Sequence, residues 1–366
     1  MNPIPIAEKS PSAMNSLTVS AQHLEPGQGG IGRVARLSVK ALQRHGKLRA
    51  LAVEDRRRYS IDSVQTVPCG GSRLGFFLAN SWEVLSGRKI LYDFAGTARA
   101  HLPVYKYRSS YAVWIHGLEL WNRPVRSDYV SAVRRADLIL ANSHYTLARA
   151  EEFIGGLPQA QVCWLGTEQD EAVTTPPQSR APALLFLGRS DDLFGKGQDI
   201  LIDAWPDVIS KVPGAKLIFA GGGTHLPKLV EMRRASPAAA DIEILGFLSD
   251  AEIDAVWARA TAFAMLSHVE GFGLVYAEAM RQGVPVLAST EDASQEINLD
   301  GVTGFNVSRS DRSGIIDRIV CLMTDRELAS ALGSAGLERW RNNFRFSCFQ
   351  ERFDRLIHPW LAAARG

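Results

Sequence analysis

Residues 262–288 read AFAMLSHVEGFGLVYAEAMRQGVPVLA and contain one strand, a glycine-rich turn, a helix and a second strand. The apolar runs 262–266 and 284–288 predict the strands, and the pattern of 274–282 predicts the helix between them. Strands that alternate with helices of this length are typical of a parallel sheet that is covered by helices on both faces.

The same alternation occurs on both sides of a polar, proline-rich segment, residues 167–182. Such segments are typical of linkers. Predicted strands before it are 15–23, 49–53, 89–93, 112–115 and 138–141, and those after it are 183–187, 215–220, 242–245, 262–266, 284–288 and 304–307. We therefore predict two doubly wound, Rossmann-like α/β domains that face each other across a cleft. Ligands of such sheets bind beyond the carboxyl ends of the strands.

The charges are divided unevenly along the chain. Residues 1–150 hold 21 Lys and Arg against 10 Asp and Glu, whereas residues 151–366 hold 20 against 29. This asymmetry indicates two domains with different partners. We expect no nucleic acid among them, because no basic run is interleaved with aromatic residues.

The segment 267–278, SHVEGFGLVYAE, carries the strongest chemical signal. Glu270 ends a strand-to-helix loop, and Glu278 lies just over one turn into the predicted helix. Glycines between them allow the backbone to approach a ligand closely. The first free amides of the helix favour an anion, and the carboxylates can bind hydroxyl groups of a sugar or a ribose.

Glu270 and Glu278, with seven residues between them, resemble the E-x7-E motif of retaining GT-B glycosyltransferases related to glycogen synthase, including bacterial exopolysaccharide and lipopolysaccharide mannosyl- and glucosyltransferases. The resemblance extends from about residue 15 to residue 358. Further matching segments are 27–33 (GQGGIGR), 136–143 (ADLILANS), 165–167 (LGT), 188–189 (GR), 196–197 (KG) and 245–249 (LGFLS).

The resemblance implies domains at 15–170 for the acceptor and 171–345 for the nucleotide-sugar donor. Residues 1–14 are expected to form a disordered leader, and residues 346–366 a helix that crosses back to the first domain. Residues expected to bind the donor are Gly29, Gly30, Arg189, Lys196, Phe247, Leu248, Gly271, Phe272, Gly273, Leu274, Val275 and Glu278.

The expected catalytic residues are Glu270, His116, Arg189 and Lys196. His116 follows a buried strand, where ligands of such sheets bind, and the family has a histidine at the matching position. Arg189 and Lys196 suit a diphosphate leaving group, because fixed cations can neutralise its charge. No D-x-D occurs in the chain. We therefore expect neither a metal nor another cofactor.

The function implied by this resemblance is transfer of a hexose, with retention, from a nucleotide diphosphate sugar to a sugar or lipid-linked acceptor in bacterial polysaccharide synthesis. GDP-mannose is the favoured donor, followed by UDP-glucose. A nucleotide-sugar epimerase of the same fold and a non-catalytic nucleotide-sugar binder remain as alternatives. A nicotinamide oxidoreductase fits poorly, because residues 25–33 do not match the dinucleotide-binding fingerprint.

The first domain is also expected to touch an anionic membrane surface. Arg33, Arg36, Lys40, Arg44 and Lys47 recur every three or four residues, which predicts one basic stripe on the first helix, followed by Arg56, Arg57 and Arg58. Such a stripe attracts anionic lipid. No signal peptide is visible, and no run reaches the roughly 18 apolar residues of a spanning helix. The expected location is cytoplasmic, with peripheral attachment to the inner face of the cytoplasmic membrane.

Overall fold

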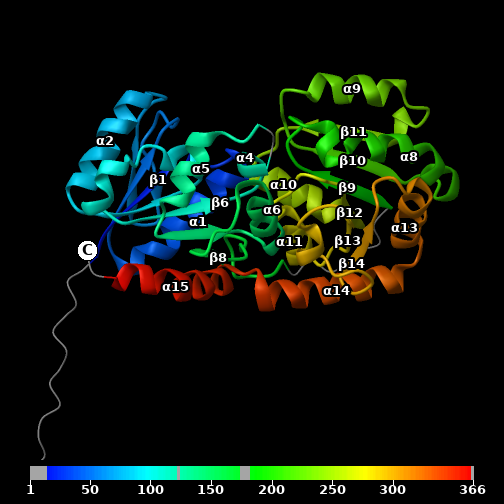
Figure 1. The fold of residues 1–366 in the computed structure, drawn as a ribbon. Helices are drawn as coiled ribbons and strands as arrows, with labels where there is room; N and C mark the ends of the chain where they lie inside the picture. The colour runs from blue at the N-terminus through cyan, green and yellow to red at the C-terminus, as the bar shows by residue number, and fades with distance from the viewer. Residues whose placement is uncertain (1–14, 122–123, 174–181, 364–366) are drawn as a thin grey trace, which may run out of the picture.

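The computed structural model describes residues 15–121, 124–173 and 182–363 and contains two α/β units along one chain (Figure 1). The predicted leader 1–14 lies outside the described residues, as do residues 174–181 of the predicted linker. Two parallel-sheet α/β domains are present, so the predicted fold class is confirmed.

The first sheet has the strand order β3-β4-β2-β1-β5-β6-β7-β8. Only the short β3–β4 pair is antiparallel among its described strands, and the other pairs are parallel. Its strands are β1 (Asn15–Ala21), β2 (Gly46–Ala52), β3 (Ser60–Ile61), β4 (Val64–Pro68), β5 (Lys89–Tyr92), β6 (Tyr111–Ile115), β7 (Leu138–Ala141) and β8 (Ala160–Val162). Its helices are α1 (Gly29–Leu42), η1 (Gln43–His45), α2 (Arg73–Leu85), α3 (Ala95–Ala98), η2 (Pro103–Tyr107), α4 (Leu118–Trp121), α5 (Ser127–Arg134) and α6 (His144–Ile154).

The second sheet is parallel throughout, with the order β11-β10-β9-β12-β13-β14. Its strands are β9 (Ala183–Leu187), β10 (Lys216–Ala220), β11 (Ile242–Gly246), β12 (Ala262–Met265), β13 (Val286–Ser289) and β14 (Gly304–Val307). Its helices are α7 (Leu193–Lys196), α8 (Gln198–Lys211), α9 (Leu226–Ala235), η3 (Ala239–Asp241), α10 (Asp250–Arg259), α11 (Leu274–Arg281), α12 (Ser294–Ile297), α13 (Arg312–Thr324) and α14 (Arg326–Asn343).

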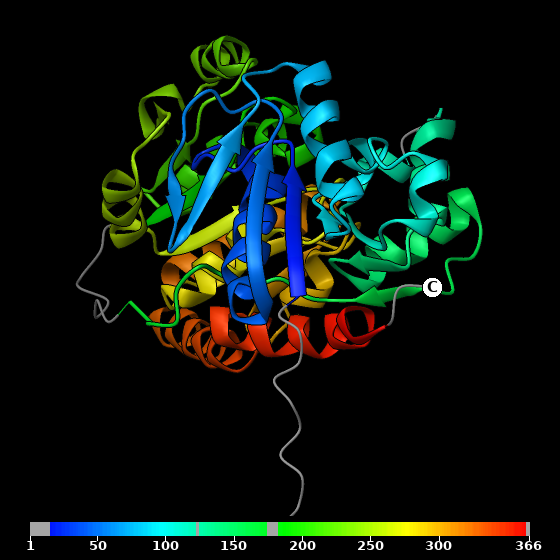
Figure 2. The ribbon, with the colours of Figure 1, turned by 90° about the vertical axis from the view of Figure 1, so that its left-hand side faces the viewer.

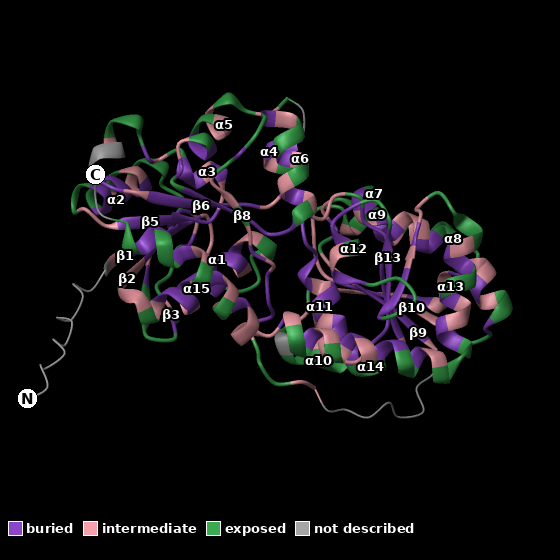
Figure 3. Cartoon of the chain, turned by 60° about the horizontal axis from the view of Figure 1, so that its bottom comes forward, coloured by how far each residue is buried: buried purple, intermediate pink, exposed green. Residues whose placement is uncertain are grey.

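The central strands of both sheets are buried, as the near-continuous apolar runs predict (Figure 3). The sequence pattern did not predict α2. This helix buries Phe76 and Val84 on one side, but it also exposes Leu74 and Leu78 on the other. A helix with apolar residues on both faces lacks the one-sided periodicity by which surface helices are recognised.

The last helix, α15 (Phe346–Ala362), packs beneath the first domain although it follows the second in the sequence (Figures 1 and 2). Phe353 stacks on Trp114 of β6 with ring centroids 6.1 Å apart, and Phe349 stacks on Phe353 at 5.4 Å. The chain segments that join the domains run side by side, because the Thr167 amide donates to the Phe344 carbonyl at 2.7 Å. The domains are therefore joined by two neighbouring crossings and by the apolar contact of α15 with the first sheet.

Only part of the predicted basic stripe of α1 is an exposed surface, because Arg44 and Lys47 are exposed whereas Arg33, Arg36 and Lys40 are partly or fully covered. Arg36 is buried and donates to Glu168 at 2.7 Å, and Arg33 pairs with Glu278 of the second domain. Arg44 pairs with Asp354 of α15. The stripe faces carboxylates from the second half of the chain, because the second domain and α15 pack against this side of α1.

Lys89 of β5 holds the carboxyl end of α15 in place. Its buried ammonium donates to the carbonyl oxygens of Trp360, Leu361 and Ala363 at 2.6, 3.0 and 2.8 Å. The last carbonyls of a helix have no partner within the helix, and a cation there also offsets the helix dipole.

We expect Lys89→Met to lower the free energy of unfolding by about 1–3 kcal/mol, because it leaves buried carbonyl oxygens without a donor. Urea unfolding measures this change. Lys211→Met is the matched control, since that lysine is half-exposed and forms only a surface ion pair with Asp317 among the described contacts. An equal, negligible effect of both substitutions would contradict the role of Lys89.

Candidate active site between the domains

The two domains meet where the loop after β12 touches the loop after β6. A Cβ atom on Gly271 would lie 1.7 Å from the carbonyl oxygen of His116 and 2.9 Å from Oγ1 of Thr146. Two side chains at the start of α6 also bind Gly271. The hydroxyl groups of Ser143 and Thr146 donate hydrogen bonds to its carbonyl oxygen at 2.6 and 3.0 Å. Only glycine permits this approach of two backbones, so Gly271 sets the spacing of the domains at this point.

Glu270 and Lys196 are adjacent in the second domain. The Lys196 ammonium donates to Oε1 of Glu270 at 2.8 Å, and both side chains are largely covered. The Glu270 carboxylate raises the pKa of Lys196, which stays cationic. The glycine after Lys196 has a φ of +83° and packs against the Leu266 carbonyl at the end of β12, which brings the two loops together.

Asp292 and Arg309 support this pair, although neither residue was predicted from the sequence. The Glu270 amide donates to Asp292, at 3.1 Å, and burial raises the pKa of Asp292 to about 6. Arg309 donates to the carbonyl oxygens of Phe194 and Gly195, next to Lys196. Asp292 lies just after β13, so its place at the carboxyl end of a strand was an available signal. Arg309 comes from the segment after β14, and no sequence motif marked it.

Arg189 lies across from the glycine-rich loop of the first domain. A Cβ on Gly29 would lie 3.8 Å from its Nη1 atom, and the guanidinium bonds to Asp191 at 2.5 Å. Phe247, which is 75% exposed, faces the same loop, 3.9 Å from the Cβ position of Gly27. The structure thus places these residues, predicted to bind the donor, around one loop.

The second glutamate, Glu278 on α11, is paired with Arg33 of α1. Arg33 also lies 4.0 Å from Glu168, so two carboxylates surround it. α11 begins after Gly273, whose φ is +82°, and its first amides cannot form bonds within the helix. Those amides belong to Leu274 and Val275.

His116 lies on the first-domain side of the site. Its Nε2 atom is 2.7 Å from the Asp93 carbonyl oxygen, and its own amide donates to Glu119 at 2.6 Å. Burial lowers the pKa of His116, which favours the neutral imidazole at pH 7. The ring lies parallel to that of Trp114, which limits its rotation.

Asp93 is a further residue that the sequence analysis passed over, although the predicted strand 89–93 ended on it. Its carboxylate accepts from the Gln22 amide at 2.7 Å and from the Thr97 hydroxyl at 2.6 Å. Burial raises the pKa of Asp93 to about 7. Asp93, just after β5, therefore connects the loop after β1 with the ring of His116, which contacts the Asp93 carbonyl oxygen.

Not every predicted donor residue presents its side chain to this region. The Phe272 ring is buried against Phe344 at 6.1 Å, and Leu274 is also buried. These two residues can contribute only backbone atoms. Gly30 has open space around its Cβ position, and Leu248 is half-buried.

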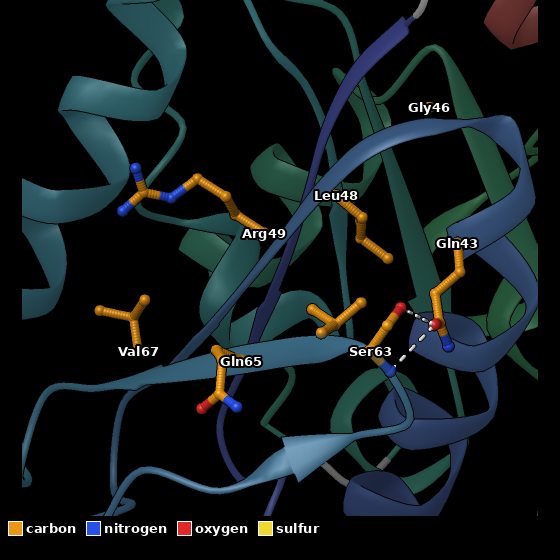
Figure 4. Close-up of a pocket in the computed structure, with 8 residues that line it drawn as sticks. Gln43, Gly46, Leu48, Arg49, Ser63, Gln65 and Val67 are labelled. Carbon is orange, nitrogen blue, oxygen red and sulfur yellow. Dashed lines mark hydrogen bonds between the residues drawn. The ribbon is translucent and has the colours of Figure 1, made fainter.

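A hollow of 460 Å³ lies elsewhere, near the amino end of β2 and beside β4 (Figure 4). Its lining includes Arg49 and Gln65. It lies at the opposite end of the sheet from His116 and is not part of the candidate site. In the described part of the chain no group of three or more His, Cys, Asp and Glu side chains could hold a metal ion.

Comparison with solved structures defines the architecture as GT-B. The chain superposes on Anabaena Alr3699/HepE in complex with UDP and glucose with a TM-score of 0.79, at 16% identity, over 94% of this chain and 100% of that one. It superposes on sucrose-phosphate synthase of Thermosynechococcus elongatus with a TM-score of 0.80, at 19% identity, over 96% of this chain and 100% of that one. At this identity the likeness shows the fold alone.

In sequence, residues 168–339 match the family described as glycosyl transferases group 1. A GDP-mannose-dependent alpha-(1-6)-phosphatidylinositol monomannoside mannosyltransferase of Mycolicibacterium smegmatis is 32% identical over 58% of this chain and 61% of its own length. The Mycobacterium tuberculosis enzyme of the same name is 34% identical over 56% of this chain and 58% of its own length. The matched region thus spans about 60% of these relatives. Residues 168–339 thus resemble the group 1 glycosyltransferases, and the fold of the chain is the GT-B fold of the solved structures.

We expect Gly271→Ala to displace the domains, because its Cβ atom would overlap the His116 carbonyl oxygen. Overpacking of this kind lowers the free energy of unfolding by about 1–3 kcal/mol. Gly156→Ala is the control, since nothing lies within 4 Å of its Cβ position. Denaturant unfolding and small-angle X-ray scattering measure stability and domain spacing. If the two variants behaved alike, the close backbone contact would be refuted.

Proposed function

We propose that the protein transfers a hexose from a nucleotide diphosphate sugar, with retention and without a metal ion, to a sugar or lipid-linked acceptor. The observation that carries this proposal is the cluster at the domain boundary. Lys196 and Glu270 lie in the loops next to Gly271, which contacts His116 of the other domain. The boundary between the domains therefore holds a cation (Lys196), a carboxylate (Glu270) and a neutral imidazole (His116).

GDP-mannose is the first choice of donor and UDP-glucose the second. Two relatives are named as GDP-mannose-dependent mannosyltransferases, whereas one structural neighbour was solved with UDP and glucose. The same relatives are named for a phosphatidylinositol monomannoside acceptor, which supports a lipid-linked acceptor in bacterial glycoconjugate synthesis. Thermal unfolding with GDP and with UDP tests the base, because saturation at 100 times Kd stabilises a protein by about 2.7 kcal/mol.

In the proposed mechanism Arg189, Lys196 and the first amides of α11 stabilise the departing diphosphate. The acceptor attacks from the face that the diphosphate leaves, and a phosphate oxygen takes the acceptor proton. Glu270 orients the donor sugar through its hydroxyl groups, and Glu278 binds the ribose. Closure around the Gly271 contact limits access of water.

A double displacement would need a carboxylate nucleophile beside the anomeric carbon. Asp93 contacts the His116 ring through its backbone carbonyl, but both carboxylate oxygens of Asp93 already accept hydrogen bonds and the residue is buried. Asp93 is therefore better suited to positioning than to attack, which supports the same-face mechanism.

We expect Lys196→Ala and Arg189→Ala each to lower kcat by about 100-fold or more, because each removes a charge that stabilises the transition state. EDTA should leave the wild-type rate unchanged. Steady-state transfer assays measure both effects, with Lys211→Ala as the control for loss of an exposed lysine. Full dependence of the rate on added Mn²⁺ or Mg²⁺ would overturn metal-independent transfer.

The two glutamates are expected to differ in their kinetic effects. Glu278→Ala should raise the donor KM, since it removes the ribose contact, and Glu270→Ala should mainly lower kcat. Donor titrations of both variants, with NMR assignment of the product anomer, check the assignment. An unchanged donor KM for Glu278→Ala would count against it, and an inverted anomer would rule out retention.

A further inference from the structure

Helix α2 exposes a stripe of large apolar side chains. Leu74, Leu78, Trp82 and Leu85 are 69%, 59%, 55% and 62% exposed. Their spacing of four, four and three residues puts them on one side of the helix. Four such side chains on one 13-residue helix are unusual for a surface that faces only water.

The neighbouring segment η2 extends this apolar surface. The Tyr105 hydroxyl donates to Ser81 of α2 at 3.1 Å, so the two elements touch. Leu102 and Val104 next to it are 36% and 69% exposed. We call the six side chains on α2 and around η2 the apolar patch. They are six of the eleven exposed large apolar side chains of the described residues.

Within residues 73–110, which contain the apolar patch, the exposed charged side chains of the described residues are positive. Between residues 73 and 110 the sequence has only two carboxylates, Glu83 and Asp93, and each is 1% exposed. Glu83 is neutralised by Arg49 and Arg88. The guanidinium of Arg49 also lies over the exposed Trp82 ring, 5.0 Å from its centroid.

Further basic side chains are exposed in the first domain. Arg73 begins α2, and Arg56, Arg57 and Arg58 are exposed in the loop after β2. Unlike the stripe on α1, these three arginines form no ion pair with a carboxylate in the described contacts. An apolar stripe bordered by arginines matches the interface of an anionic bilayer, where acyl chains and phosphate groups lie within a few ångströms of each other.

We infer that α2 and η2 dock the protein on anionic lipid, with α2 lying in the plane of the bilayer interface. Trp82 suits this position, because tryptophan combines an apolar ring with a polar N–H group. No described helix has the length and apolar character needed to cross a bilayer. A second copy of the chain is a poorer occupant, because pairing two such patches would bring their arginines together without carboxylates to offset them.

The position of α2 relates this surface to the proposed function. α2 begins just after Gly71, whose Cβ position lies 3.4 Å from Glu54 beyond the carboxyl end of β2. The candidate site also lies at the carboxyl edge of this sheet. Docking through α2 therefore brings the acceptor side of the site towards lipid headgroups; this step alone rests on the proposed function.

The test is co-sedimentation of the full chain with phosphatidylcholine vesicles that contain or lack phosphatidylglycerol, at low and high salt, without any sugar donor. Wild type should bind the anionic vesicles at low salt. Leu78→Ser combined with Trp82→Ser should weaken binding by about tenfold or more, since two large apolar side chains leave the lipid. Val302→Ser is the matched control, because Val302 is 52% exposed on the second domain.

A second measurement guards against misfolding of the double variant. Brominated lipids should quench wild-type tryptophan fluorescence, and Trp82→Phe should remove most of that quenching. GDP or UDP binding by both variants should equal that of wild type, which separates failure of docking from failure of the proposed function. Equal binding of wild type and double variant to anionic vesicles overturns the inference. A wild-type dimer that the double variant converts to a monomer, without vesicle binding, also overturns it and assigns the patch to self-association.

Discussion

The close backbone contact between Gly271 and the carbonyl of His116 is the constraint on which the rest of the site depends. It joins the loop that carries Glu270 to the strand end that carries His116, and Ser143 and Thr146 reinforce it with hydrogen bonds to Gly271. Any side chain at residue 271 would force these loops apart. The distance between the loop of Glu270 and the strand end of His116 is therefore set by main-chain atoms, which vary less in position than long side chains do.

The oppositely charged halves of the chain meet at several ion pairs within the molecule. The basic side of α1 faces Glu168, Glu278 and Asp354. Ion pairs that are partly exposed contribute little to stability, so these contacts orient the domains more than they hold them together. The stacked rings of Trp114, Phe349 and Phe353, all of them buried, supply the larger apolar contribution.

The ionic groups of the candidate site are paired with one another in the structure. Lys196 is paired with Glu270 and Arg33 with Glu278, which avoids leaving partly buried charges without partners. A diphosphate sugar that used these groups would have to exchange partners with them. Each carboxylate released from its cation could then accept a hydroxyl group of the sugar or of the ribose. New bonds to such a ligand would offset the energetic penalty of separating each ion pair.

The sequence by itself determined the two α/β domains, most strand positions and the Glu270–Glu278 segment, because apolar periodicity and glycine turns act over a few neighbouring residues. Only the tertiary structure decided which side chains contact one another across elements that are distant in the sequence. The stripe on α1 reads as a solvent-exposed basic surface until carboxylates more than 100 residues away in sequence cover it. Asp93, Asp292 and Arg309 carry no motif, since their partners come from other elements. α2 lacked one-sided periodicity because both of its faces are apolar, and burial alone shows which of these faces the core covers and which it leaves exposed.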